Sequence, residues 1–273
     1  MYMMPTHFGP MCGPRQGSGG KKFTFNPDKR KRTTLTVSFL TNANQLQKFL
    51  PPGFELAGEP VVTVFEGFMK EIDWLAGRGY NVLGVKFPVI YNGTKDRATG
   101  PFLTVLWENL ADPILTGREQ LGYSKIFCDL PEPIVYKGET HCTASWMGFK
   151  FLDLKLNNLE EISPEESSPI ISESDKELLR GIIHYKYIPR TGEWGKADAE
   201  YAVLSPDPVK PSLPEKLFKG SGEVTFHKAR WEDLPTQYMI INALHELEII
   251  EYRGASIEHT IGSGDLSNQR ILV

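Results

Sequence analysis

Short apolar segments rich in β-branched and aromatic residues recur along the chain, and this pattern constrains the fold more than any other feature. Turn-forming residues separate the segments, which follow one another at about 8–12-residue spacing. We expect strands in segments 33–40, 61–69, 80–93, 100–109, 134–156, 181–189, 199–205, 220–229 and 239–259. Because long helical periodicity is nearly absent, the pattern predicts a mainly β (α+β) protein, an antiparallel barrel or sandwich with a few short helices.

Local signals refine this prediction. Residues 42–50 carry helical spacing and are followed by Pro51-Pro52, which predicts a short helix ending there. Segment 134–156 is interpreted as a hairpin that turns at Lys137-Gly138. The acidic, Ser- and Pro-rich segment 159–179 is expected to form a surface loop or short helix. Without a linker in the middle of the chain, we predict an extended N-terminal arm over 1–30 and one domain over 31–273.

Bulk composition excludes several classes of protein. The net charge is -4 over 273 residues, which argues against a nucleic-acid-binding protein. No window approaches 18 consecutive apolar residues, so no membrane partner is expected. Cys12, Cys128 and Cys142 lack paired spacing and are interpreted as reduced thiols in a cytoplasmic protein.

The common cofactor and nucleophile motifs are absent. The glycines of AGRGYNVLG do not fit the dinucleotide fingerprint, and no phosphate-binding GxxxxGK[ST] occurs. His245-Glu246 begins like a zinc helix, but position 249 is Ile. No GxSxG elbow occurs either. We therefore expect neither cofactor nor metal, and attention turns to Lys125 in GREQLGYSK, which precedes the apolar residues IFC.

The segment TGREQLGYSKIFCDL resembles the acetoacetate decarboxylase family, which places a Gly-Arg-Glu triplet shortly before a Schiff-base lysine. Further resemblance lies in LWENLADPILTGRE, FPVIYNG, TASWMGFKF, HYKYIP and LPTQYMI, so the similarity spans about Pro27 to Arg253. The resemblance implies a cone-shaped, mostly antiparallel β-barrel or double-sheet domain that assembles into homo-oligomers. It also implies that Lys125 forms an imine with a carbonyl substrate.

A lysine suits this chemistry only when its amine is neutral. An ordinary lysine has a pKa of about 10.4, so fewer than roughly one in a thousand is neutral at pH 7. Burial or a nearby cation lowers such a pKa, and acetoacetate decarboxylase is a known example of this effect. We expect Lys125 to owe its reactivity to desolvation and to neighbouring cations.

The resemblance also assigns partners to Lys125. Arg32 and Glu66 align with a site arginine and a site glutamate of the family. We expect Arg32 to bind the substrate carboxylate, because a guanidinium stays charged when buried and grips both oxygens. The other candidates each have a structural alternative; they are Tyr80 and Gln120 as catalytic groups, and Tyr252 and Trp107 as substrate-binding or wall residues. Arg118 and Glu119 are expected to form a buried pair that shapes the turn before Lys125.

Two departures from the family pattern leave the reaction open. Ile126 replaces the second lysine of the decarboxylases, and Val82 stands where they carry a second glutamate. Some members of the superfamily instead condense pyruvate with an aldehyde and dehydrate the adduct. We therefore expect a Schiff-base lyase acting on a 2-oxo acid such as pyruvate. The alternatives are a β-keto acid decarboxylase, and a barrel that binds a small molecule without catalysis.

Overall fold

The computed structural model describes Met4 and residues 30–164, 178–207, 214–262, 266 and 268–273. The predictions about the N-terminal arm and Cys12 lie outside these residues, as does most of the predicted acidic loop. Cys128 and Cys142 are free and buried.

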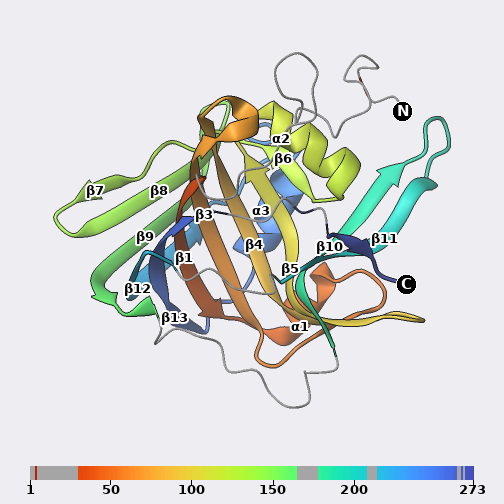
Figure 1. Cartoon of the computed structure of the whole chain (residues 1–273), viewed down its shortest axis with the longest axis horizontal. Helices are drawn as coiled ribbons and strands as arrows, with labels where there is room; N and C mark the ends of the chain where they lie inside the picture. The colour runs from red at the N-terminus through yellow and green to blue at the C-terminus, as the bar shows by residue number, and fades with distance from the viewer. Residues whose placement is uncertain (1–3, 5–29, 165–177, 208–213, 263–265, 267) are drawn as a thin grey trace.

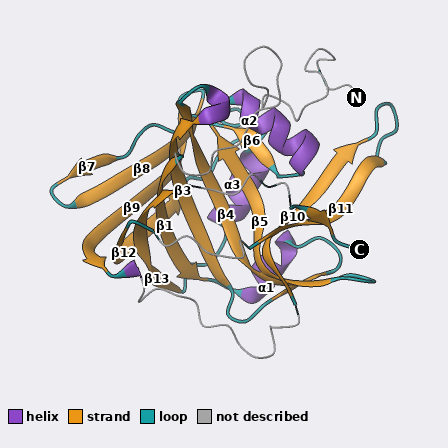
Figure 2. Cartoon of the chain, viewed as in Figure 1, coloured by secondary structure: helices purple, strands orange, loops and turns teal. Residues whose placement is uncertain are grey.

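Strands dominate the described chain (Figures 1 and 2). The strands are β1 (Lys31–Leu40), β2 (Phe54–Leu56), β3 (Val61–Ile72), β4 (Arg78–Asn92), β5 (Arg97–Glu108), β6 (Lys125–Phe127), β7 (Ile134–Tyr136), β8 (Glu139–Trp146), β9 (Phe149–Ile162), β10 (Leu179–Pro189), β11 (Ala197–Pro206), β12 (Lys216–Phe226), β13 (Glu251–Ile261) and β14 (Arg270–Ile271). The α-helices are α1 (Ala43–Leu46), α2 (Ala111–Thr116) and α3 (Tyr238–His245). Short 3-10 turns cover Gln47–Phe49 and Asp73–Leu75, and a π-helical turn covers Gly117–Leu121.

The strands form one large mixed sheet. Its order is β14-β11-β10-β5-β4-β3-β1-β13-β12-β9-β8-β7, with β2 added to β4 and β6 added to β5. The β5–β6 and β5–β10 pairs are parallel, and the other pairs are antiparallel. The prediction of a mainly β fold is confirmed. Within the described residues, however, β14 and β7 do not pair with each other, so the sheet is curved but not closed into a barrel (Figure 1).

Two local predictions are confirmed. The helix expected over 42–50 forms as α1 followed by the 3-10 turn, and the Asn42 side chain accepts a hydrogen bond from the Asn44 amide at its start. The hairpin turn forms at Lys137 and Gly138, whose φ angles are 49° and 83°. Two consecutive positive φ angles match the twist of antiparallel strands, and glycine adopts such an angle without strain.

The strand expected over 239–259 is wrong in its first part. Residues 238–245 form α3, and the strand begins only at Glu251. Ile241 and Leu244, three positions apart, are the buried residues of this helix. Helical spacing therefore outweighs the strand-like composition, because it lets the segment bury one stripe against the sheet.

The central strands carry different side chains on their two faces, because successive residues of a strand point in opposite directions. The face that carries Lys125 is called the lysine face. It holds a small apolar cluster of Phe65, Met69, Ile72, Val82, Leu103, Leu106 and Tyr123. The opposite face is called the core face, and it holds the larger cluster that includes Leu35, Val64, Phe68, Leu83 and Trp107.

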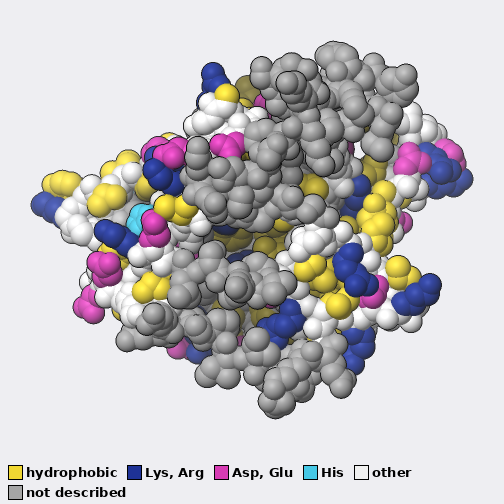
Figure 3. Space-filling model, viewed as in Figure 1, with side chains coloured by type: hydrophobic (Ala, Val, Ile, Leu, Met, Phe, Trp, Pro, Cys, Tyr) yellow, Lys and Arg dark blue, Asp and Glu magenta, His cyan; other side chains and the backbone are white. Residues whose placement is uncertain are grey.

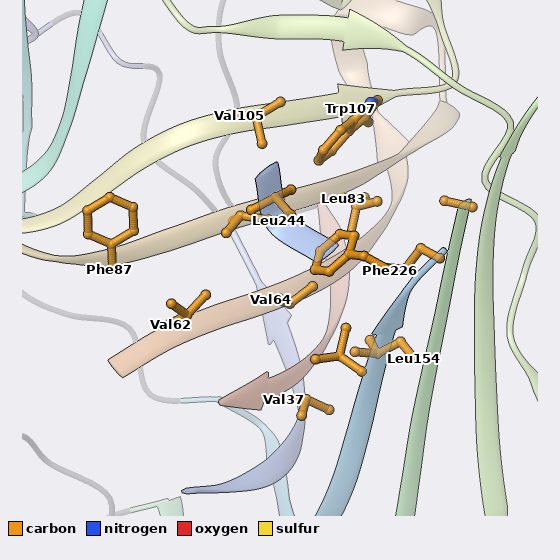
Figure 4. Close-up of a cluster of buried hydrophobic side chains, with 14 of the residues drawn as sticks. Val37, Val62, Val64, Leu83, Phe87, Val105, Trp107, Leu154, Phe226 and Leu244 are labelled. Atoms are coloured by element: carbon orange, nitrogen blue, oxygen red, sulfur yellow. The ribbon is translucent and has the colours of Figure 1, made fainter. Parts of the chain in front are cut away.

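The core face contains most of the buried apolar surface (Figure 4). Val64, Leu83 and Trp107 project into it from β3, β4 and β5, and Leu244 of α3 packs among them. Burial of one large aliphatic or aromatic side chain stabilises a fold by about 1.5–3 kcal/mol. This rigid layer supports the strands that carry the lysine face.

The β7–β8 hairpin projects from one end of the sheet, and apolar side chains are visible at its tip (Figures 1 and 3). Ile134, Val135 and Tyr136 of β7 are 65%, 70% and 67% exposed. The expectation of a homo-oligomer stays a prediction. In the part of the chain that the structure describes, no helix has the length and apolar character needed to cross a membrane.

Candidate active site

Lys125 opens strand β6, directly after a helical turn that the GREQLG sequence builds. Helix α2 continues into the π-helical turn Gly117–Leu121, which ends at Gly122 with a φ of 79°. The Tyr123 amide donates to the Gly117 carbonyl at 2.9 Å, and Lys125 then pairs with Leu106 of β5. The chain therefore reverses within a few residues and brings the lysine back beside α2.

Both glycines of this turn make room for a lysine. A Cβ atom at Gly117 would lie 2.4 Å from Cδ and Cε and 2.6 Å from Nζ of Lys125. A Cβ atom at Gly122 would lie 2.8–3.0 Å from the side chain of Lys186. Gly117 is therefore required because the Lys125 side chain lies across its Cα atom.

The Lys125 amine is held in a fixed, largely dry position. Its Nζ lies 2.8 Å from Oε1 of Glu108 and donates to the Pro113 carbonyl at 3.0 Å. The two side chains are 9% and 1% exposed. Oε2 of Glu108 has no hydrogen-bond partner. One face of the amine is thus fixed by two oxygens, and a carboxylate oxygen beside it is available for proton transfer.

The electrostatics of this pair differ from the sequence prediction. Cations were expected to favour the neutral amine, yet the charged group that contacts Lys125 among the described residues is the Glu108 carboxylate. Burial raises the pKa of Glu108, and the Lys125 ammonium opposes this shift. In a dry site both charged forms are penalised, so transfer of one proton from ammonium to carboxylate yields a neutral amine beside a neutral acid. The two groups therefore titrate as a coupled pair.

Tyr123 and His184 form a stacked layer beside the Lys125 amine, and hydrogen bonds hold this layer in place. Lys125 Nζ lies 5.6 Å from the centre of the Tyr123 ring, which stacks on His184 at 4.0 Å. The hydroxyls of Tyr123 and Ser205 are 2.7 Å apart, and Gln269 Nε2 donates to the Ser205 hydroxyl at 2.7 Å. Burial lowers the pKa of His184 to about 4, so this layer adds no imidazolium charge near neutral pH.

Arg32 lies on the lysine face, and its role in binding the substrate carboxylate stays a prediction. A Cβ atom at Gly67 would lie 3.3 Å from Nε and 3.4 Å from Nη2 of Arg32, and 3.0 Å from Cγ2 of Val82. The guanidinium therefore crosses from β1 onto β3 and lies beside Val82. Its Nε is buried without a hydrogen-bond partner. Val82 pairs with Glu108 on β5, so Arg32 approaches the lysine pair along one rung of the sheet.

Tyr80 and Gln120 stay candidates. Tyr80 opposes Met69 of β3, and its ring lies 6.3 Å from that of Trp74. It therefore belongs to the lysine face. Gln120 lies in the π-helical turn before Lys125, and its backbone carbonyl accepts a hydrogen bond from Lys186 at 3.4 Å.

Glu66 does not lie with Lys125. It alternates with Phe65 along β3 and opposes Leu35 and Leu83, all within the core face. Its side chain is fully buried, neither carboxyl oxygen has a partner that meets ordinary hydrogen-bond geometry, and the Cys142 thiol is a polar group that interacts with it. Burial raises its pKa to about 8. The structure therefore separates Glu66 from the lysine by the thickness of the sheet, and direct catalytic contact is not supported.

Trp107 and Tyr252 also lie away from the lysine face. Trp107 is fully buried in the core face, where its indole donates to Oε1 of Gln237 at 2.7 Å. Tyr252 lies on β13, its ring 6.5 Å from that of Phe39, and its hydroxyl donates to the Val224 carbonyl at 3.3 Å. Both have structural roles in this arrangement, and the prediction that they contact substrate is not supported.

The predicted pair of Arg118 and Glu119 does not form. Arg118 is exposed, and its Nη1 donates to the Lys125 carbonyl at 2.8 Å. The Glu119 carbonyl accepts from Lys186 at 2.7 Å. Arg118 still shapes the turn, but it does so by anchoring the backbone of the lysine itself.

Sequence reasoning missed two charged residues of the lysine face, Glu108 and Lys86. Glu108 ends β5, and Lys86 lies on β4 in the same alternation as Val82 and Gly84. Alternation along each strand was readable from sequence. The pairing of Glu108 with a lysine after an intervening helix was not, because it depends on the parallel β5–β6 contact.

A cavity of about 430 Å³ lies on the other side of β6. Ser124 and Ile126 line it, together with residues of β10 and α3, but Lys125 does not. The alternation of β6 explains this: the lysine points to one face and its two neighbours to the other. The Lys125 amine therefore does not face this cavity.

Comparison with known proteins bears on this site. A family model described as Acetoacetate decarboxylase (ADC) matches residues 10–261. An acetoacetate decarboxylase from Clostridium botulinum is 30% identical over 139 residues, which cover 48% of this chain and 54% of that protein. The match thus spans about half the length of this relative.

Solved structures share the fold. A structure of acetoacetate decarboxylase has a TM-score of 0.65 at 15% identity, covering 91% of both chains. Acetoacetate decarboxylase from Legionella pneumophila has a TM-score of 0.61 at 16% identity, covering 94% of both chains. The enduracididine biosynthesis enzyme MppR complexed with pyruvate has a TM-score of 0.59 at 15% identity, covering 94% of this chain and 95% of that one. With a family model matching most of its length, the chain belongs to the acetoacetate decarboxylase family.

Proposed function

We propose that this protein is a Schiff-base-forming lyase that uses Lys125 on a 2-oxo acid such as pyruvate, condensing it with an aldehyde and dehydrating the product. The observation that carries this proposal is the buried pair of Lys125 and Glu108, with 2.8 Å between Nζ and Oε1. An amine that must become neutral in a dry site needs an acceptor for its proton, and Glu108 is placed to be that acceptor.

Imine formation follows from this geometry. Proton transfer from Lys125 to Glu108 yields a neutral amine and a neutral acid. The amine nitrogen adds to the substrate carbonyl carbon, and one of its protons moves to the carbonyl oxygen. Glu108 then gives its proton to the departing hydroxyl, which leaves as water, and a protonated C=N bond remains on Lys125.

The condensation uses the same two groups. Glu108 removes a proton from the methyl carbon of the iminium, and the iminium nitrogen accepts the electron pair as an enamine. The enamine carbon attacks the aldehyde carbon, and Glu108 returns its proton to the aldehyde oxygen. A second proton removed from the same carbon leaves with that oxygen as water, and hydrolysis of the imine releases the unsaturated product and Lys125.

Arg32 would bind the substrate carboxylate in this scheme. Its guanidinium reaches the rung of Val82 and Glu108 and has a buried Nε without a partner. A substrate carboxylate would satisfy that donor, and an unpaired carboxylate in this site would be costly to desolvate.

Decarboxylation of a β-keto acid is the second candidate. The relative from Clostridium botulinum, named an acetoacetate decarboxylase, is the observation that favours it. Carbon dioxide loss from the iminium would leave the same enamine, which then takes up a proton. Two features weigh against it, because Val82 occupies the rung beside Glu108 where decarboxylases carry a carboxylate, and Glu66 faces the core.

Borohydride reduction tests this proposal. The protein is incubated with pyruvate or acetoacetate, reduced, and analysed by intact mass and peptide mapping. We expect a stable adduct on Lys125 with pyruvate, and little carbon dioxide release from acetoacetate. An adduct on another lysine would overturn the assignment of Lys125, and rapid carbon dioxide release would favour the second candidate.

A further inference from the structure

Besides Lys125 and Arg32, the lysine face carries the cation Lys86, which forms no ion pair with any residue that the structure describes. Among the described residues, Lys86 has neither a hydrogen bond nor an ion pair through its side chain; its ammonium lies 5.3 Å from the centre of the Phe65 ring. Burial is the main cause that lowers its pKa, and Arg32 adds to the shift. A half-buried ammonium facing another cation is destabilising unless an anion joins them.

Arg32 and Lys86 approach the lysine pair from opposite directions along the sheet, since Arg32 opposes Met69 and Lys86 opposes Thr63 of β3. The Arg32 guanidinium lies over Gly67 beside Val82, which opposes Glu108. The Phe65 ring under Lys86 covers Gly84, since a Cβ atom there would lie 2.4 Å from the ring. Gly84 opposes Leu106, and Leu106 pairs with Lys125. The two cations therefore approach the amine from neighbouring levels of the sheet.

The side chains bring the two charges towards neighbouring levels, because the Arg32 guanidinium crosses Gly67 and the Lys86 ammonium lies near the Phe65 ring. Val82 and Gly84 are separated by one two-residue step of β4, which is roughly 7 Å. A single carboxylate does not bridge two cations that far apart, but a short dicarboxylate places one group near each. Lysine supplies a compact charge for a single group, whereas the guanidinium grips a carboxylate through two donors.

The surrounding charges do not cancel this pair. Glu258 is the carboxylate that interacts with both Arg32 and Lys86, and Arg30 adds a further positive charge near Arg32. Glu108 is already paired with Lys125. Glu258 thus supplies one negative charge for the two positive charges of Arg32 and Lys86.

We propose that the preferred substrate is a 2-oxo acid with a second carboxylate, which Lys86 binds while Arg32 binds the first. This inference rests on the proposed function, because it takes Lys125 as the residue that forms the imine. It adds a substrate class, the 2-oxo dicarboxylates, and assigns Lys86 as the residue that selects it.

The first experiment compares oxo acids as imine-forming substrates. Oxaloacetate, 2-oxoglutarate, pyruvate and 2-oxobutanoate are titrated against the full chain, and trapping by borohydride is quantified by intact mass. We expect half-maximal trapping at concentrations about tenfold to a hundredfold lower for the two diacids. A phosphonate analogue, 3-phosphonopyruvate, tests the nature of the second anion. If it is preferred over both diacids, the assignment of a carboxylate is wrong.

Variants assign the preference to Lys86. Lys86→Met should reduce the ratio of diacid to monoacid affinity about tenfold or more, and Lys86→Arg should retain most of it. Lys70→Met is the matched control, because Lys70 is an exposed lysine of β3 paired with Glu132, and it should keep the wild-type ratio. An unchanged ratio in Lys86→Met, or wild-type affinities that do not favour the diacids, would overturn the proposal.

A binding assay separates this proposal from the proposed function. Succinate and butanoate form no imine, so their calorimetric affinities report only the charged contacts. Preference for succinate that is lost in Lys86→Met supports the two-cation site even if no adduct forms on Lys125. Trapping of pyruvate without any preference for succinate or the diacids would leave the lyase proposal standing and reject the dicarboxylate.

Discussion

Two glutamates are buried in the central sheet, one on each face, and they differ in what surrounds the carboxyl group. Glu108 lies on the lysine face, 1% exposed and 2.8 Å from the Lys125 amine. Glu66 is fully buried on the core face among Leu35, Leu83 and the Cys142 thiol. Burial raises the pKa of both, but only Glu108 has a cation that opposes the shift.

This difference shows that burial alone does not make a carboxyl group catalytic. A buried carboxyl group without a charged partner stays protonated, because the anion is costly to desolvate. A carboxyl beside an amine can exchange a proton with it at little cost. The distinction between a proton carrier and a neutral core residue therefore depends on which face of the sheet the side chain occupies.

The largest effect is expected from removal of the amine. Lys125→Ala should abolish borohydride trapping and lower kcat/KM by roughly 10⁴-fold or more, because the covalent step is lost. The measurement is steady-state kinetics combined with intact mass. Lys70→Ala serves as the surface control. If borohydride still traps an adduct on Lys125→Ala, the reaction does not take place at Lys125.

The two glutamates can be compared directly by conservative substitution. Glu108→Gln should lower kcat/KM by about 10²–10³-fold, because the proton acceptor beside Lys125 is lost. Glu66→Gln should change it by less than about threefold, because the amide replaces an acid that is already neutral near pH 7. Equal losses in the two variants would contradict the division of roles between the faces.

Gly117→Ala tests how strictly the amine is positioned. The new methyl group would lie within 2.4–2.6 Å of Cδ, Cε and Nζ of Lys125, so the lysine must move. We expect kcat/KM to fall about 10–100-fold, since a displacement of about 1 Å can cost that much. Thermal unfolding of the variant provides the check on folding. Unchanged kinetics would mean that the amine is not held in the observed position.

The smallest effect concerns stability and pH. The pKa of Glu66 is about 8 in the fold against a reference value of 4.5, so the folded state keeps this proton where the unfolded chain has lost it. The stabilising contribution is complete below the unfolded pKa and is lost as pH rises towards 8, by about 1.4 kcal/mol per pH unit.

Glu66→Gln should flatten this slope. Denaturant unfolding at about pH 5.5 and 7.5 should show the wild type losing roughly 2–3 kcal/mol more than the variant across that interval. If the free energy of unfolding changes with pH equally in the wild type and in Glu66→Gln, then the pKa of Glu66 in the folded protein is close to its value in the unfolded chain.

Much of this protein was predictable from local patterns. The strand-rich composition predicts the mainly β fold, Pro51-Pro52 marks the end of the first helix, and Lys137-Gly138 marks a hairpin turn. The resemblance of GREQLGYSK to the family implies a role for Lys125 that stays a prediction, and the two glycines that precede it are explained by the space that two lysine side chains occupy. These features depend on neighbours in the chain, so the sequence is sufficient to find them.

Other features depend on pairing between distant segments. Glu66 aligns with a family glutamate, yet β-strand alternation turns it to the core face. Glu108 meets Lys125 only because β6 adds in parallel to β5, after α2 and the π-helical turn return the chain. The β4–β5 pair has a register shift between Val85 and Lys86, and this shift could not be predicted from the alternation of residues along either strand.

The sequence by itself determined the class of fold, which follows from composition and local spacing, and its resemblance to the family implied that Lys125 forms the imine. Only the tertiary structure decided which charged side chains lie near Lys125. Arg32, Lys86 and Glu108 come from three strands, and the register of those strands sets which of their side chains share a face. A one-residue change in register would exchange the faces, so the charge environment of Lys125 is a property of the assembled sheet.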